Sequence, residues 1–154
     1  MSEAQLPTVL LVDDEEAILR SLRRALRSEP YRIVTAPHAE AALAWAEGSE
    51  PDVVVTDLRM PRIDGLELLR RLLAVRPGVV AILLTGHGDS LGPLGLPGGR
   101  PVYRVLAKPW NDEELRVTVL LALRYRELLR ENAELRERAE RQIAAVRELA
   151  AKER

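Results

Sequence analysis

The chain has 154 residues and a formal net charge of −1, with 47% hydrophobic and 31% charged residues. This length predicts one globular domain with an extension, because ~120 residues bury a sufficient core without disulfides. The absence of cysteine excludes a disulfide framework, a thiol nucleophile and a cysteine-ligated zinc site. The balanced charge gives no reason to expect binding to nucleic acid or to an anionic membrane. The short polar start of the chain is unlike a signal peptide, and every apolar run is far shorter than the ~20 residues of a membrane span, so we expect a cytoplasmic protein.

Five short apolar runs are typical of buried parallel strands. They are rich in Val, Ile and Leu and read without polar alternation, which is the pattern of strands covered on both faces. These runs are Val9–Val12, Tyr31–Thr35, Val53–Thr56, Val79–Leu84 and Val102–Leu106.

Helix-like segments separate the first four runs. Residues Glu15–Ser28 place their apolar side chains on one side, and the Ala-rich segment Pro37–Glu47 carries proline in its first turn, where the missing N–H costs little. Residues Gly65–Val75 follow Asp64 and have Glu67 at the position of a capping box. Alternating strands and helices predict an α/β fold, a doubly wound five-stranded parallel sheet of flavodoxin-like order 2-1-3-4-5.

The stretch Gly86–Pro101 breaks this alternation after the fourth strand. It is rich in glycine and proline, which cost ~1 and ~3 kcal/mol relative to alanine inside a helix. We therefore expect a loop, or at most one helical turn, where a fourth helix would stand. One interpretation is a mobile, altered output surface; the other is drift that has weakened the coupling.

A single long helix is predicted from Asn111 to the end of the chain, which contains no glycine or proline from Asn111 onward. Asn111 and Glu114 form a plausible capping box. The second half shows a heptad pattern in which Leu at d and one Asn at a favour a parallel two-stranded coiled coil. The d positions are Leu121, Leu128, Leu135, Gln142 and Leu149, and the a positions are Tyr125, Asn132, Ala139 and Val146. We expect a domain over residues 1–125 and a dimeric coiled-coil helix over residues 126–154; a lone charged helix is the alternative.

Acidic residues follow two of the predicted strands that become neighbours in this order. Asp13 and Asp14 end the first strand, and Asp57 ends the third. Ligands bind beyond the carboxyl ends of strands in open α/β sheets, so the three carboxylates should converge on one crevice. Converging carboxylates repel one another unless a cation neutralises them, and oxygen ligands of this kind suit Mg²⁺. Thr85 and Lys108 fall at the ends of the fourth and fifth strands, which makes a chance placement of turn residues a poor explanation.

The chain resembles the receiver domains of bacterial response regulators over about residues 7–125. Any one match is weak, but the order and spacing of four matches are highly specific. The matching stretches are Val9–Glu15, Asp57–Gly65, Leu84–His87 and Leu106–Trp110.

The resemblance implies a switch in phosphorelay signal transduction, not a turnover enzyme. Asp57 would accept a phosphoryl group from a sensor histidine kinase or a small phosphodonor. Lys108 would pair with the phosphoryl oxygens, and the Thr85 hydroxyl would hydrogen-bond to them. The family's usual cis bond would correspond to Lys108–Pro109.

The resemblance also implies a metal site and a docking surface. Asp14, Asp57 and the backbone carbonyl of Arg59 would ligate Mg²⁺ directly, and Asp13 would do so mainly through water. Arg59 and His87 would flank the approach to the phosphate. Four arginines on the first helix could face the kinase or form a solvated surface; they are Arg20, Arg23, Arg24 and Arg27.

One position departs from the family in a way that concerns signalling. The family usually carries an aromatic residue three positions before the lysine, where this chain has Val105. By strand alternation we expect Tyr103 to share a face with Val105. Two other functions stay open: a pseudo-receiver that acts only as a dimerisation scaffold, and a haloacid-dehalogenase-type phosphatase. The phosphatase would need a second aspartate at position 59, where Arg59 stands.

Overall fold

A computed structural model describes residues 6–27, 30–86 and 102–153. Its centre is a five-stranded parallel sheet in the order β2-β1-β3-β4-β5, which confirms the predicted flavodoxin-like topology. The strands are β1 (Thr8–Val12), β2 (Arg32–Ala36), β3 (Val53–Asp57), β4 (Val80–Thr85) and β5 (Arg104–Ala107).

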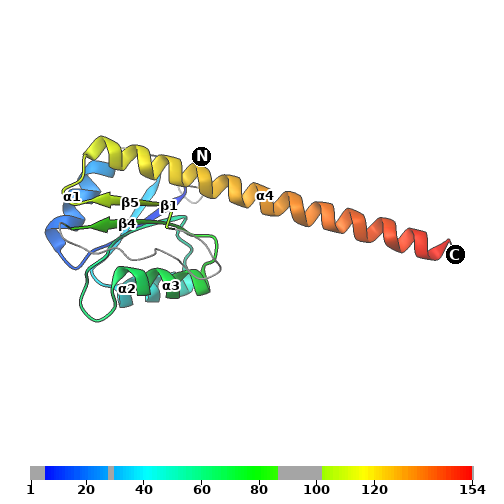
Figure 1. The fold of residues 1–154 in the computed structure, drawn as a ribbon, viewed down its shortest axis with the longest axis horizontal. Helices are drawn as coiled ribbons and strands as arrows, with labels where there is room; N and C mark the ends of the chain where they lie inside the picture. The colour runs from blue at the N-terminus through cyan, green and yellow to red at the C-terminus, as the bar shows by residue number, and fades with distance from the viewer. Residues whose placement is uncertain (1–5, 28–29, 87–101, 154) are drawn as a thin grey trace.

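Helices cover both faces of this sheet (Figure 1). Helices α1 and α4 lie on one face, and α2 and α3 lie on the other. Their bounds are α1 (Glu16–Leu26), α2 (Ala39–Gly48), α3 (Gly65–Val75) and α4 (Asp112–Lys152). The predicted bounds of the strands and helices agree with the observed bounds to within two residues. Two predicted helix ends, Ser28 and the last residue of the chain, lie outside the described residues and are not compared.

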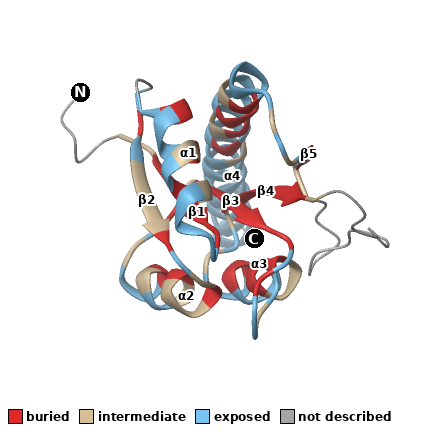
Figure 2. Ribbon diagram, turned by 90° about the vertical axis from the view of Figure 1, so that its left-hand side faces the viewer, coloured by how far each residue is buried: buried red, intermediate tan, exposed pale blue. Residues whose placement is uncertain are grey.

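The central strands are buried along their whole length, whereas the edge strands are not (Figure 2). Strands β2 and β5 include exposed residues such as Arg32 and Arg104. The expectation of five continuously buried strands was therefore wrong for the two edges. An edge strand has one neighbour only, so the helices on the two faces leave its outer side open to solvent.

Side-chain caps begin three of the helices. Asp64 accepts a hydrogen bond from the Glu67 N–H at 2.8 Å, and Asn111 accepts one from the Glu114 N–H at 3.0 Å, as predicted. The prediction for α2 was wrong. Its N-cap is His38, whose Nδ1 accepts from the Ala41 N–H at 3.0 Å, so Pro37 precedes the helix and does not occupy its first turn.

Tyr103 and Val105 pack on opposite faces of the sheet, which corrects the alternation argument. Val105 packs against the core under α2 and α3, and Tyr103 packs against the core under α1 and α4. Tyr103 lies in a bend just before β5, where the alternation of a regular strand does not apply. Its ring stacks on Tyr125 of α4, with ring centroids 5.2 Å apart.

Helix α4 has 41 residues and extends well beyond the sheet (Figure 1). Residues 131–153 are all exposed, including Leu135, Val146 and Leu149 of the predicted heptad. None of the described helices combines the length and apolarity needed to cross a bilayer. The prediction for the glycine- and proline-rich stretch concerns residues that, apart from Gly86, lie outside the described part of the chain.

Candidate functional site

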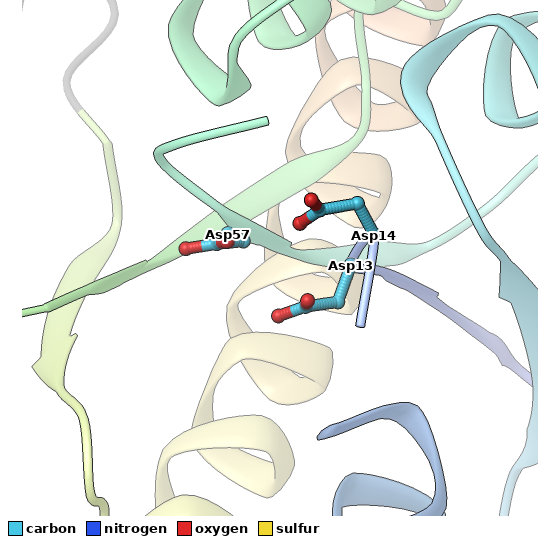
Figure 3. Close-up of side chains that lie close together, drawn as sticks. All are labelled: Asp13, Asp14 and Asp57. Atoms are coloured by element: carbon cyan, nitrogen blue, oxygen red, sulfur yellow. The ribbon is translucent and has the colours of Figure 1, made fainter. Parts of the chain in front are cut away.

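Three carboxylates converge at the carboxyl edge of the sheet (Figure 3). Asp13 and Asp14 follow β1, and Asp57 is the last residue of β3. These strands are neighbours in parallel register, with Val12 opposite Thr56, so both chain segments reach the edge at the same level. One oxygen from each carboxylate lies within 4.8 Å of the others. The sequence prediction that these residues meet is therefore confirmed.

Lys108 places a positive charge among these acids. Its Nζ lies 2.9 Å from Oδ2 of Asp13 and 3.2 Å from Oδ1 of Asp57. It directly follows β5, and its backbone N–H donates to the carbonyl of Thr85 at 2.7 Å. The peptide bond between Lys108 and Pro109 is cis, as the family resemblance implied.

Burial controls the electrostatics of the two inner carboxylates. Asp13 has no exposed surface and Asp57 has 6%, whereas Asp14 is exposed. Burial raises the pKa of Asp13, although Lys108 and the Glu15 N–H act to lower it. Burial and the charge of Asp13 raise the pKa of Asp57. Burial acts to lower the pKa of Lys108, but its hydrogen bonds and charge pairing with the two carboxylates outweigh this and raise it.

The site also carries more buried negative charge than its lysine balances. One ammonium faces two buried carboxylates, so one negative charge stays uncompensated among the described side chains. The exposed carboxylate of Asp14 adds a third negative charge at the same edge. A hard divalent cation is the ligand that this donor set fits, because carboxylate oxygens are the ligands that Mg²⁺ and Ca²⁺ take.

Thr85 and Arg59 occupy the expected places beside the acids. Thr85 is the last residue of β4 and is 9% exposed, one position along from Leu84, which pairs with Asp57. The backbone N–H of Arg59 hydrogen-bonds to the Asp57 carboxylate, and its side chain is exposed. The roles of the Thr85 hydroxyl and of the Arg59 carbonyl remain predictions. His87 lies outside the described residues.

The loop after Asp57 contains two features that sequence reasoning did not identify. A Cβ on Gly65 would overlap the backbone carbonyl of Asp57, so only glycine lets α3 start this close to β3. Arg62 has a φ of 68°, a left-handed conformation that is rare for a residue with a side chain. Its guanidinium pairs with Glu40 of α2 at 2.9 Å. The Asp-Gly pair at positions 64 and 65 is the sequence feature that could have indicated the close approach of Gly65 to the Asp57 carbonyl.

A cleft of about 520 Å³ lies beside the site and was also missed. It is bounded by α1 and by the segment that follows β5. Its lining residues are Ile18, Ser21, Arg24, Lys108, Pro109, Trp110 and Asp112. The Trp110 Nε1–H donates to Oδ1 of Asp112 at 3.0 Å, which holds the indole at this position.

The strand order and the acidic edge with its lysine are those of a receiver-type α/β domain. The sequence profile described as "Response regulator receiver domain" matches residues 9–120. The chain therefore belongs to the response regulator receiver domain family.

Similar proteins include transcriptional regulators and a receiver domain of known structure. The chain is 39% identical over 125 residues to the C4-dicarboxylate transport transcriptional regulatory protein DctD of Pseudomonas aeruginosa, covering 80% of this chain and 27% of DctD. It is 37% identical over 132 residues to the probable transcriptional regulatory protein TcrX of Mycobacterium tuberculosis, covering 84% of this chain and 52% of TcrX. The signal receiver domain of an HD domain-containing protein from Pseudomonas fluorescens Pf-5 matches with a TM-score of 0.70 and 34% identity, covering 80% of this chain and 98% of that one. The chain thus spans between about a quarter and about half of these curated relatives.

Proposed function

We propose that the chain is a phosphorylation switch in which Asp57 accepts a phosphoryl group from a sensor histidine kinase. The observation that supports this most is the meeting of Asp57, Asp13 and Asp14 within 4.8 Å at one edge of the sheet, with Lys108 paired to the first two. A structural ion pair would need one acid for one lysine. The surplus of buried negative charge fits a site that binds a cation, and the bound cation would then allow an anionic phosphoryl group to approach Asp57.

In the transfer step an Asp57 carboxylate oxygen bonds to phosphorus while the P–N bond to the kinase imidazole breaks. The electron pair of that bond stays on the imidazole. Lys108 pairs with the phosphoryl oxygens, and the Thr85 hydroxyl donates a hydrogen bond to one of them. Such a transfer depends mainly on positioning and charge neutralisation.

Asp14, Asp57 and the carbonyl of Arg59 hold Mg²⁺ directly in this proposal, and Asp13 holds it mainly through water. Bound Mg²⁺ supplies positive charge for the phosphoryl oxygens. The hydrogen bonds of Asp13 favour the indirect role, because its Oδ1 accepts from the Glu15 N–H at 2.9 Å and its Oδ2 accepts from Lys108. Both of its oxygens therefore already have a partner in the protein.

Incubation with acetyl phosphate and Mg²⁺, followed by intact-mass measurement, tests the proposal. We expect one phosphoryl adduct in the wild type and in Asp64→Asn, and none in Asp57→Asn. Asp64→Asn is a matched control because it makes the same chemical change in an exposed helix cap that asparagine can also form. Absence of any adduct in the wild type would favour the scaffold function. Continuous release of phosphate beyond one equivalent would favour a phosphatase.

The kinase docks on α1 and the adjoining cleft in this proposal. Arg20, Arg23 and Arg24 are exposed on α1 and Arg27 is exposed at its C-cap, and Arg24 lines the cleft together with Lys108. A partner in the cleft would therefore lie next to the phosphoacceptor site. The expected result of charge reversal at Arg23 and Arg24 is slower transfer from the kinase with unchanged transfer from acetyl phosphate.

The extended part of α4 joins two chains as a parallel coiled coil in this proposal, with the receiver over residues 1–125 and the coiled-coil helix over 126–154. The large apolar side chains among the a and d positions are exposed in a single chain: Leu121, Tyr125, Leu128, Leu135, Val146 and Leu149. A second copy would bury this stripe and would pair Glu131 at g with Arg136 at the following e. Phosphorylation would then alter the geometry or strength of the dimer. Identical scattering profiles and dimer affinities with and without beryllofluoride and Mg²⁺ would count against this coupling.

A further inference from the structure

The last contacts between α4 and the receiver body are ionic. Along the helix, apolar burial is complete at Leu115, Val119 and Ala122 and only partial at Leu129. Arg126 and Arg130 lie on the same side of the helix, one turn apart, and both reach acids at the amino edge of the sheet. Beyond Arg130 every described residue of the helix is exposed. These two arginines therefore hold the helix at the point where it leaves the body.

Arg126 is buried although it carries a charge. Its side chain is 10% exposed, and its guanidinium lies 3.0 Å from Oε1 of Glu50 and 3.7 Å from Oδ1 of Asp52. A Cβ on Gly78 would overlap this guanidinium, so the missing side chain of Gly78 provides the space that Arg126 fills. A charged group in such a place needs its partners, because leaving it buried without them is strongly unfavourable.

Asp52 connects both arginines to three strands. Its Oδ1 accepts from Arg130 at 3.1 Å, and its Oδ2 accepts from the Thr8 N–H at 2.8 Å. Its backbone N–H donates to the Thr8 carbonyl at 2.9 Å, and its carbonyl accepts from the Val80 N–H at 3.0 Å. Asp52 directly precedes β3, so this one residue ties β1, β3 and β4 together at their amino ends. The arginines are thus attached to the three central strands of the sheet.

We propose that Glu50, Asp52, Arg126 and Arg130 form a clamp that fixes the direction and rotational phase of the extended part of α4. Arg126 and Arg130 are positioning residues in this role. The clamp lies at the amino edge of the sheet, whereas Asp57, Lys108 and the start of α4 lie at the opposite, carboxyl edge. Its consequence for signalling rests on the dimer of the proposed function: the clamp decides which helix face meets the second copy.

A small change in angle at the clamp produces a large displacement at the end of α4. The 22 residues from Glu131 to Lys152 rise about 33 Å at 1.5 Å per residue, so a tilt of about 10° at the clamp moves the end of the helix by about 6 Å. A helix without the clamp would still be held by its buried apolar face up to Ala122, by the stack of Tyr125 on Tyr103 and by the partial burial of Leu129. The part of α4 beyond the receiver body would then sample many directions. The a and d side chains would no longer face one fixed direction.

Spin-label distances within one chain test the clamp. The chain has no cysteine, so Ala44→Cys on α2 and Ala144→Cys on α4 give two unique labelling positions, both exposed, and position 144 lies outside the predicted seam. Dilution with unlabelled protein makes the measured distance intramolecular even in a dimer. We expect a narrow distribution in the otherwise wild-type chain. It should widen at least twofold in Glu50→Gln/Asp52→Asn and in Gly78→Ala, which displaces Arg126 without removing a charge.

Arg141→Gln is the matched control, because it removes one arginine from the exposed part of the same helix and should leave the width unchanged. Arg130→Gln changes an exposed side chain and gives a milder test in a protein that folds normally. Widths equal to the wild type in all clamp variants, or a wild-type distribution as broad as theirs, would overturn the proposal. Sedimentation equilibrium on the same samples decides the dimer separately, so a monomeric protein with a narrow distribution would refute the dimer and keep the clamp.

Discussion

Lys108 Nζ lies 2.9 Å from Oδ2 of Asp13, a carboxylate with no exposed surface. The two residues are 95 positions apart in sequence and come from strands at different places in the sheet, since β5 is an edge strand and β1 is separated from it by β3 and β4. Lys108 thus reaches along the carboxyl edge across two strands. It pairs with Asp57 on the way, so one ammonium balances part of the charge of two buried acids.

We expect Lys108→Met to impair both stability and phosphorylation. It keeps the apolar stem but removes the charge that faces Asp13 and Asp57, and breaking a buried pair in this way costs several kcal/mol. Because the Lys108 side chain is 18% exposed, we expect a smaller loss of about 2–3 kcal/mol, measured by urea unfolding without metal. The rate of adduct formation from acetyl phosphate should fall at least about tenfold, which corresponds to ~1.4 kcal/mol in the barrier.

A double-mutant cycle provides the control for this prediction. Asp13→Asn combined with Lys108→Met removes both charges, so the pair should lose less stability than the sum of the two single variants. Lys152→Met makes the same substitution on the exposed end of α4 and should be neutral. Strict additivity would show that Lys108 and Asp13 do not stabilise one another.

The metal-free protein should lose stability as the pH rises above about 4. The folded-state pKa values of Asp13 and Asp57 are raised from 3.8, so the folded state binds more protons than the unfolded state just above that pH. Stability therefore decreases with rising pH until both groups are ionised in the folded state as well. Urea unfolding in EDTA across this range should show the decrease, and Asp13→Asn should flatten it.

Added Mg²⁺ should reverse this loss at neutral pH, because a cation that binds only the folded state stabilises it by mass action. The melting temperature of the wild type should rise with Mg²⁺ concentration. Asp57→Asn should show a weaker rise, whereas Asp64→Asn, which lies in the α3 cap, should behave like the wild type. Equal responses in all three proteins would mean that the ion binds elsewhere.

The sequence was sufficient for those parts of the fold and site that depend on residues near one another or on strand ends. The acids at the carboxyl ends of β1 and β3 had to meet once the strand order was known. Asp64 and Asn111 indicated the starts of α3 and α4 through local capping. Contacts that depend on three-dimensional packing could not be predicted from the sequence. Nothing in the sequence indicates that Gly78 makes room for Arg126, or that Tyr103 turns toward Tyr125 instead of sharing a face with Val105.

We predict opposite effects of alanine at two glycines. Gly65→Ala should destabilise the domain by about 1–3 kcal/mol, because its Cβ would overlap the Asp57 carbonyl and force the backbone apart. Gly48→Ala meets no atom within 4 Å at the end of α2 and should stabilise by about 0.5–1 kcal/mol through helix propensity. Chemical unfolding measures both. Gly65→Ala should also slow phosphorylation, since it displaces the phosphoacceptor backbone; equal stability of the two variants would contradict the close approach.

Placement of a charge in the predicted seam should separate the two chains of the proposed dimer. Leu135 is 60% exposed in a single chain and occupies a d position, so Leu135→Asp would introduce two charges into one interface by symmetry. Two lost leucine contacts at about 1.5–3 kcal/mol each predict a dimer dissociation constant raised at least about a hundredfold. Ala144→Asp adds the same charge at an f position and should leave association unchanged. Sedimentation equilibrium distinguishes these outcomes, and equal weakening by both variants would point to general repulsion between charged helices instead of a specific seam.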